Sequence, residues 1–223
     1  MKICGISDMH GNLGFEIKPC EILCICGDIV PLDIQKHNKA TLEWLSNKFV
    51  PWCEKQPCEI IFLIAGNHDF IAMDDPDGWE KMFEGSKVKY LLDSGAEYKG
   101  FKIYGTPWCH QFYNWAFMTS DDKLAKIYSK IPSNTDILLT HDAPYGTSDV
   151  ILQDVWWSDG KHIGCKPLSD AVAEKCPVLM LHGHLHSTNH ELEMAGETKV
   201  YNVSLLDENY KMSYKPLYLE LVN

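Results

Sequence analysis

The chain has 223 residues, with 20 basic residues against 31 acidic ones and a formal net charge of −11 at pH 7. Hydrophobic residues make up 45% and charged residues 23%, which are the proportions of a folded, water-soluble domain. The longest apolar run, residues 60–65, is far shorter than the roughly 18 residues that a membrane-spanning helix needs. The acidic balance argues against a protein that binds long nucleic acid, because that binding depends on basic side chains that neutralise phosphates.

Short apolar runs recur along the chain, rich in Ile, Val or Leu and closed by Gly, Asn, Asp or His. These runs cover residues 2–6, 21–26, 60–65, 136–139, 178–181 and 199–203. Such runs are typical of strands that are buried on both faces. Stretches with the apolar spacing of a helix lie between them, at residues 37–49, 121–130 and 168–175. Strands that alternate with helices predict an α/β fold with a largely parallel core.

Two further segments have a different pattern. Residues 107–117 are too aromatic and too irregular for a regular element, and we expect a loop there. Residues 217–222 are expected to form a closing strand. The chain contains no internal repeat, no low-complexity tract and no linker rich in Pro or Gly, so we expect residues 1–223 to form a single domain.

The cysteines carry information about the compartment. There are nine, an odd number, and they are scattered along the chain, which predicts reduced thiols. Asp8 and His10 precede any apolar stretch as long as a signal peptide, so no secretory signal is expected. We therefore predict a cytoplasmic protein. Cys20, Cys24 and Cys26 lack a second pair with zinc-site spacing and are interpreted as small buried side chains.

Five of the predicted strands run directly into residues that commonly bind metal ions. These are Asp8 with His10, Asp28, Asn67 with His68 and Asp69, His141 with Asp142, and His184 with His186. Ligands of open α/β sheets bind beyond the carboxyl ends of the strands, so we expect the five groups to converge. Residues two apart on an extended segment point to the same side, which lets Asp8 and His10 serve one centre. Imidazole combined with carboxylate favours Zn, Mn, Fe, Ni or Co over Ca or Mg.

The five groups, in this order, resemble the signature of calcineurin-like metallophosphoesterases, which reads D-x-H, G-D, G-N-H-[DE], H and G-H-x-H. All five blocks occur between residues 8 and 186. The resemblance extends to the branch of small metallophosphoesterase-domain-containing proteins through residues 106–108, 115–117, 140–146 and 162–165. It implies an α/β fold of the metallophosphoesterase type. This fold is a β-sandwich of two mixed sheets flanked by helices, with the metal site at the carboxyl ends of the strands.

The same resemblance implies a ligand set and a reaction. One ion would be held by Asp8, His10 and His186, the other by Asn67, His141 and His184, and Asp28 would bridge the two. The implied cofactors are two divalent transition-metal ions, drawn from Mn, Fe, Zn, Ni and Co, with Mn favoured. The implied reaction is hydrolysis of a phosphodiester or a phosphomonoester by in-line attack of a metal-bridging hydroxide.

The resemblance also assigns the two residues that follow Asn67. His68 would protonate the leaving oxygen or stabilise the charge that develops on it. Asp69 would orient His68 by accepting its other ring proton, and stabilisation of the local loop is the alternative. His68 and Asp69 are therefore the candidate catalytic residues.

Substrate contacts are assigned from position in the chain. Asn67, Trp108 and His110 are the candidates, and packing of a long loop is the alternative for Trp108. The loops at residues 107–117 and 148–164 are expected to shape the pocket. The remaining histidines and acids receive other expectations: His182 is buried and structural, His37 and His190 lie on the surface, His162 flanks the pocket or is structural, and Asp142 and Asp149 are solvated or structural.

Several functions are compatible with this pattern. The leading prediction is an enzyme that acts on a small phosphoester. A nuclease should show a basic track beside the site, and the basic residues here are few and dispersed. A phosphoprotein phosphatase is a further alternative. A non-catalytic metal-binding scaffold with the same fold should have lost a ligand or His68, and none is missing. The sequence leaves the oligomeric state open, a homodimer included.

Overall fold

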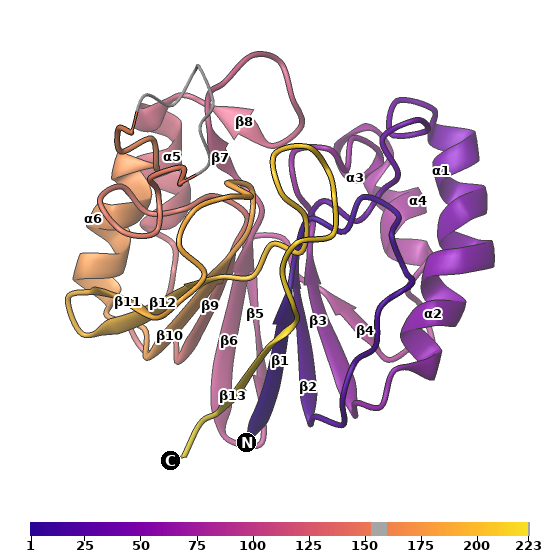
Figure 1. Cartoon of the computed structure of the whole chain (residues 1–223), viewed down its shortest axis with the longest axis horizontal. Helices are drawn as coiled ribbons and strands as arrows, with labels where there is room; N and C mark the ends of the chain where they lie inside the picture. Colours follow the sequence, from indigo (N-terminus) through magenta and orange to yellow (C-terminus); the bar gives the residue numbers. More distant parts are fainter. Residues whose placement is uncertain (153–159, 223) are drawn as a thin grey trace.

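The computed structural model describes residues 1–152 and 160–222. In that part of the chain two β-sheets pack face to face, and helices cover their outer faces (Figure 1). The predicted pocket loop at residues 148–164 therefore falls partly outside the described residues, at residues 153–159. Over the described ranges, no helix is both long enough and apolar enough to span a membrane.

The first sheet has, among the described residues, five strands in the order β13-β1-β2-β3-β4. Their bounds are β1 Lys2–Ile6, β2 Ile22–Cys26, β3 Ile60–Ile64, β4 Val88–Tyr90 and β13 Leu217–Glu220. The first four strands run parallel, and β13 pairs with β1 in the antiparallel direction. The three apolar runs predicted for this half and the predicted closing strand are confirmed.

The second sheet, counted over the same described ranges, has six strands in the order β11-β12-β10-β9-β6-β5. Their bounds are β5 Ser94–Tyr98, β6 Phe101–Thr106, β9 Ile137–Thr140, β10 Leu179–His182, β11 Glu193–Ala195 and β12 Thr198–Asn202. The four central strands are parallel, and the edge strands β5 and β11 are antiparallel to their neighbours. The predicted strands at residues 136–139, 178–181 and 199–203 are confirmed. The predicted sandwich of two mixed sheets is confirmed with them.

Helices fill the connections between the strands. Their bounds are α1 Asn38–Trp44, the π-helix η1 Leu45–Phe49, α2 Val50–Lys55, α3 Ile71–Asp74, α4 Pro76–Lys81, α5 Asp121–Tyr128 and α6 Lys166–Lys175. The three predicted helices are confirmed, and the first continues without a break through η1 and α2 to Lys55. Pro51 is the second residue of α2, and the π-helical turn η1 directly precedes it.

Three apolar clusters hold the layers together. The cluster between the sheets joins side chains of both, among them Ile3, Ile22, Phe62, Ile103, Leu139 and Leu181. A second cluster packs η1 and α4 on the outer face of the first sheet, through Leu23, Leu63, Phe49 and Trp79. A third packs α5 and α6 on the outer face of the second sheet, through Leu138, Met180, Leu124 and Leu168. The result is a helix–sheet–sheet–helix sandwich whose strands are buried on both faces.

The aromatic segment at residues 107–117 is only partly a loop. Cys109–His110 forms β7, which pairs in parallel with β8, Met118–Thr119. The backbone N–H of Cys109 donates to the Phe117 carbonyl (2.8 Å), and the N–H of His110 donates to the carboxylate of Asp142 (2.8 Å). The prediction of a loop is therefore wrong at Cys109 and His110, because Asp142 and Phe117 satisfy their backbone groups.

The cysteines behave as predicted within the fold. All nine are free thiols, and Cys24 and Cys26 are fully buried in β2. Cys20 is 9% exposed and packs in the cluster beneath the first sheet. These three residues are thus small apolar side chains of the core.

Candidate metal centre

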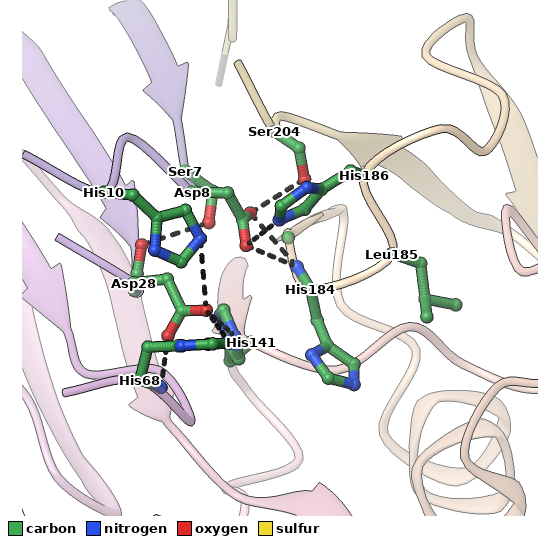
Figure 2. Close-up of polar contacts among 12 residues, drawn as sticks. Ser7, Asp8, His10, Asp28, His68, His141, His184, Leu185, His186 and Ser204 are labelled. Carbon is green, nitrogen blue, oxygen red and sulfur yellow. Dashed lines mark hydrogen bonds and ion pairs between the residues drawn. The ribbon is translucent and has the colours of Figure 1, made fainter. Parts of the chain in front are cut away.

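Most of the motif residues gather at the carboxyl ends of β1, β2, β3, β9 and β10 (Figure 2). Backbone hydrogen bonds connect these ends. The N–H of Asp8 donates to the Gly27 carbonyl (3.1 Å), and the N–H of Gly183 donates to the His141 carbonyl (3.1 Å). The Asp8 carboxylate accepts from the N–H of His184, at 3.1 Å to each oxygen. That bond joins the end of the first sheet to the end of the second.

Asp8, His10 and His186 form the first group of ligand-type side chains, with one ligand atom of each within 4.8 Å of the others. Asp8 is fully buried, and its Oδ1 lies 3.2 Å from Nε2 of His186. Ser204 Oγ donates to Asp8 Oδ2 (2.7 Å). Nδ1 of His186 donates to the Asp207 carbonyl (3.0 Å), which turns Nε2 toward Asp8. Ser204 and Asp207 were not predicted, because neither belongs to a motif.

Asp28 lies at the middle of the site. Its Oδ2 is 3.3 Å from Nε2 of His141, 3.7 Å from Nε2 of His10 and 3.9 Å from Nε2 of His68. Its Oδ1 accepts from the backbone N–H of His68 (2.7 Å). Nε2 of His141 also lies 2.9 Å from Asn67 Oδ1. One carboxylate therefore faces the ring nitrogens of three imidazoles.

His184 is placed differently from the rest of its expected ligand set. Its ring points away from Asp8 (Figure 2) and lies beside that of His141, with 5.2 Å between centroids. The ligand atoms of His184, His141 and Cys109 lie within 4.8 Å of one another. The thiol of Cys109 is an unexpected neighbour, and the aromatic residues around it in the sequence provide no signal for this position.

The donor set fits divalent metal ions. Both ring nitrogens of His10 are buried and lack a hydrogen-bond partner. Nδ1 of His141 donates to the Cys26 carbonyl (2.7 Å), so a neutral ring leaves Nε2, Asn67 Oδ1 and Asp28 Oδ2 as three facing acceptor atoms. A cation satisfies such a set. In the absence of an ion a proton takes this place: burial lowers the pKa of His141, but the charge of Asp28 outweighs it and raises that pKa to about 10.

The backbone makes room for this arrangement at two glycines. A Cβ on Gly66 would collide with Oδ1 and the backbone nitrogen of Asp28, and one on Gly183 would collide with Ser7 Oγ and Asp8 Oδ2. Neither glycine has a positive φ, so close approach to the two carboxylates is what excludes a side chain.

Four of the ligand-type residues themselves adopt left-handed backbone. Their φ values are 53° for Asp8, 41° for His10, 53° for Asp28 and 68° for His184. Residues other than glycine rarely adopt this conformation, and such outliers cluster at functional sites. The strand ends are thus bent at the positions that carry the ligands.

Burial controls the charge of these groups. It lowers the pKa of His10 to about 4, although the Asp28 charge acts in the opposite direction, and it lowers the pKa of His184 to about 4. Neutral imidazole is the form that binds a metal ion. Burial also acts to raise the pKa of Asp28, but the charges of His141 and His68 outweigh it and hold that pKa well below its ordinary value. The site therefore offers ionised carboxylates and two neutral imidazoles. Burial lowers the pKa of His186, but the hydrogen bond to Asp8 outweighs it and raises that pKa to about 9, so that His186, like His141, exchanges a proton for an ion.

The hydrogen bonds of Asp69 favour the second of the two roles stated for it. Its carboxylate accepts four backbone N–H groups, those of Asp28, Ile29, Val30 and Gly66, at 2.8 to 3.1 Å. The ring of His68 is oriented by Gln35 instead, since Nδ1 of His68 lies 2.6 Å from Gln35 Oε1. Asp69 fixes the loops that carry Asp28 and Asn67, which is the alternative stated above. Gln35 follows no motif and was missed.

The expected substrate contacts divide between the cavity and the core. A cavity of about 820 Å³ opens over the centre, and both Asn67 and His110 line it. Trp108 does not line it, because its indole N–H donates to Asp93 (2.8 Å) and its ring packs against the core. The structure thus favours packing of the loop, the alternative stated for Trp108. His110 is held by its Nδ1 at 2.8 Å from Asp142 Oδ2.

The two remaining acids are structural. Asp142 and Asp149 are both buried, so the solvated alternative is wrong for each. Asp149 accepts from the N–H groups of Gly146 (2.9 Å) and Gly164 (3.0 Å) and lies 2.6 Å from Nδ1 of His162. His162 is half exposed, and its neighbour Ile163 lines the cavity instead.

The other histidines agree with expectation except one. His182 is fully buried and His37 is exposed, as predicted. His190 is not a free surface residue. Its ring stacks on Tyr214 with 3.6 Å between centroids, and its Nε2 lies 2.8 Å from the His186 carbonyl. It therefore supports the loop of a ligand-type residue.

Comparisons with known proteins agree with this geometry. A family model described as calcineurin-like phosphoesterase matches residues 1–213. Metallophosphoesterase domain-containing protein 1 of Homo sapiens is 28% identical over 240 residues, which cover 97% of this chain and 69% of that protein. The UPF0046 protein C25E10.12 of Caenorhabditis elegans is 30% identical over 174 residues, which cover 71% of this chain and 60% of that protein.

A solved structure gives the same fold. Phosphopantetheinyl hydrolase (PptH) from Mycobacterium tuberculosis superimposes with a TM-score of 0.57 at 12% identity, over 94% of this chain and 90% of the other. At that identity the likeness concerns the fold alone. The family model, by contrast, spans every motif residue described above. The chain belongs to the family of calcineurin-like phosphoesterases, which are metal-dependent hydrolases of phosphoester bonds.

Proposed function

We propose that the chain is a dinuclear metal-dependent phosphoesterase that hydrolyses a phosphodiester or a phosphomonoester of a small molecule. The observation that carries this proposal is the position of Asp28, whose Oδ2 lies within 3.9 Å of ring nitrogens of His10, His68 and His141. His10 lies on the side of Asp8 and His186, whereas His141 lies on the side of Asn67. A carboxylate with ligands on both sides suits a bridge between two ions.

Each ion has its own set of residues in this proposal. Asp8, His10 and His186 would hold one ion, Asn67, His141 and His184 the other, and Asp28 would bridge them. Bound ions would supply Lewis acidity toward the phosphoryl oxygens and a lowered pKa for coordinated water. These nitrogen and oxygen donors accept several first-row ions, and manganese is our first choice.

His68 is proposed as the proton donor to the leaving oxygen. Gln35 Oε1 accepts from Nδ1 of its ring, so Nε2 is directed to the side of Asp28 and the cavity. A proton held at Nε2 is then available to an ester oxygen in the cavity. The backbone N–H of His68 donates to Asp28 Oδ1, which fixes the position of the proposed proton donor relative to the proposed bridging carboxylate. Asn67 and His110, which line the same cavity, are proposed to contact the substrate.

Two further proposals concern the whole chain. We propose that residues 1–223 are one domain, because the cluster between the sheets joins side chains from Ile3 to Leu221. We also propose a cytoplasmic location, because the nine cysteines are unpaired and most of them are buried in the core.

The test is hydrolysis by protein reconstituted with Mn²⁺. Bis-p-nitrophenyl phosphate and p-nitrophenyl phosphate are compared, and their ratio separates diesterase from monoesterase activity. Asp28→Ala should lose both activity and bound metal, whereas His68→Ala should lose activity and keep its metal. His37→Ala, which removes an exposed histidine, is the matched control and should keep both. Full activity of Asp28→Ala would contradict the mechanism. Bound metal without turnover in the wild-type protein would favour the alternative of a non-catalytic metal-binding scaffold.

A further inference from the structure

The cavity over the metal centre has an aromatic wall. It is lined by Phe112, Tyr113 and Trp115, which lie between β7 and β8, and by Tyr210, which lies between β12 and β13. None of these four residues belongs to a metal-binding motif. The wall is continuous with the centre, because His68 and Asp28 line the same cavity.

Trp115 is fixed beside the proposed proton donor. Its ring lies 4.5 Å from that of His68, measured between centroids, with 36° between the planes. The next residue, Ala116, donates its backbone N–H to the carbonyl of Asn67 (3.1 Å). The aromatic segment is therefore attached directly to a residue of the ligand set.

Tyr210 lies over the other side of the centre. Its ring centroid is 5.1 Å from that of His10 and 5.4 Å from that of His186. The loop that carries it is organised by Asp207, whose carbonyl accepts from the N–H of Tyr210 (2.8 Å) and whose carboxylate accepts from the N–H of Lys211 (3.0 Å). Tyr210 is thereby held in a left-handed conformation, with φ of 57°.

Phe112 and Tyr113 form the outer part of the wall. Their side chains are 52% and 74% exposed, and their ring centroids lie 4.6 Å apart. Two adjacent exposed aromatic rings at the mouth of a cavity form an apolar surface of the kind that marks a binding site. Aromatic rings bind other rings through stacked or edge-to-face contacts.

The wall itself contains no lysine or arginine, although Lys36 Nζ lies 5.2 Å from the centroid of the Trp115 ring. The chain contains no arginine, so all 20 of its basic residues are lysines. Among the described residues that line the cavity there is no lysine, and residues 153–159, outside the described part, include none in their sequence. The nearest charge in the lining beyond the centre is acidic, at Glu208. Phosphate groups beyond the one at the metal ions would have no lysine or arginine in the lining to pair with, and the ring of His110 is already paired with Asp142.

We propose, as a refinement that rests on the function proposed above, that the substrate is a phosphodiester with a single negative charge. The second ester group, which does not leave, would be an aromatic or other planar apolar ring bound against Phe112, Tyr113 and Tyr210. The metal centre receives the one phosphate, and the aromatic wall receives the ring. Substrates with several phosphates or carboxylates bind poorly, because Glu208 repels them and no lysine lines the cavity.

The test uses three diesters with the same leaving group, p-nitrophenolate. They are methyl, phenyl and 4-carboxyphenyl p-nitrophenyl phosphate, hydrolysed by protein reconstituted with Mn²⁺. The phenyl ester should exceed the methyl ester in kcat/KM by about tenfold, mainly through KM, as expected for one stacked ring. The carboxylate adds one charge to the same ring and should lower kcat/KM at least threefold, by a rough estimate for one unpaired charge.

A double variant, Phe112→Ala with Tyr113→Ala, measures the contribution of the outer part of the wall to the preference for the phenyl ester. Both side chains are exposed, so the fold is retained, and the preference for phenyl over methyl should fall to about twofold or less. Met194→Ala removes an equally exposed apolar side chain from β11 and should keep the preference of the wild type. This ratio cancels differences in the intrinsic reactivity of the esters.

The outcomes distinguish the proposed substrate class from the proposed phosphoesterase function. Turnover of all three esters at equal kcat/KM, or a phenyl preference that the double variant retains, would overturn the aromatic site and leave the phosphoesterase intact. Best turnover of the carboxyphenyl ester would overturn the charge selection. Absence of metal-dependent release of p-nitrophenolate from all three would overturn this refinement, and the proposed function falls with it only if p-nitrophenyl phosphate is also not hydrolysed.

Discussion

Asp69→Asn tests whether the carboxylate beside His68 serves the loop or the ring. Each Asp69 oxygen accepts from two backbone N–H groups: Oδ2 from Asp28 (2.9 Å) and Gly66 (2.8 Å), and Oδ1 from Ile29 (3.1 Å) and Val30 (3.0 Å). The side chain is fully buried, so water cannot replace any of these bonds. An asparagine keeps one oxygen and directs an NH₂ group at the other pair of donors.

The magnitude follows from these four bonds. Burial and the charge of Asp28 raise the pKa of Asp69 to about 7, so the comparison is made at pH 8, where the carboxylate is ionised. Two N–H groups then lose an ionised acceptor, and a hydrogen bond to a charged group contributes about 1.5 to 3 kcal/mol. The free energy of unfolding should therefore fall by about 3 to 6 kcal/mol. For a domain of this length, 1 kcal/mol corresponds to about 2 to 4 °C, so the melting temperature should fall by roughly 6 to 24 °C.

The assay is thermal unfolding followed by circular dichroism in excess chelator, so that changes in metal affinity do not contribute. Asp74→Asn, an exposed carboxylate at the end of α3, is the control and should change stability by no more than about 0.5 kcal/mol. A variant Asp69→Asn with the melting temperature of the wild type and a kcat reduced 100-fold would refute the reasoning. Such a result would mean that Asp69 acts on His68 and that the four backbone bonds are weak.

Gln35→Ala should give the opposite result. Its kcat should fall about 10-fold or more, because His68 loses its orienting acceptor, while the melting temperature stays within about 2 °C of the wild type. An unchanged kcat would contradict this prediction. Ser204→Ala removes the donor to Asp8 Oδ2 and should weaken metal binding about tenfold, measured by competition with a chromogenic chelator. Gly183→Ala places a Cβ against Asp8 and should lower stability by about 1 to 3 kcal/mol in urea unfolding. Saturating Mn²⁺ at 100 times its Kd should raise stability by about 2.7 kcal/mol over the chelated protein, and equal melting temperatures would argue against a native metal site.

The central strands could be predicted from sequence because parallel strands that are buried on both faces require continuous apolar runs. The edge strands could not. β5 (Ser94–Tyr98) has no fully buried residue and β11 (Glu193–Ala195) has only three residues, so neither produces an apolar run. β7 was missed for another reason. Its two residues are held by the Phe117 carbonyl and the Asp142 carboxylate, and neither partner is visible from local sequence.

The ligand-type residues could be predicted because each occupies a short motif at a strand end. The groups that position them could not. Gln35 lies 33 residues from His68, and Ser204 lies 196 residues from Asp8, so only the folded chain brings these pairs together. Their residue types, an amide and a hydroxyl, are also common on protein surfaces and carry no signal by themselves.

The left-handed backbone at Asp8, His10, Asp28 and His184 has an evolutionary consequence. A residue other than glycine held in this region costs about 1 to 3 kcal/mol. Glycine adopts the same conformation without that strain, so selection for stability alone would favour glycine at all four positions. Natural proteins remain only just stable enough to function, and this chain retains four strained residues where it needs carboxylates and imidazoles. A homologue that is no longer under selection for catalysis would gain stability if glycine replaced these four residues. Glycine at these positions would therefore indicate a homologue that has lost the activity.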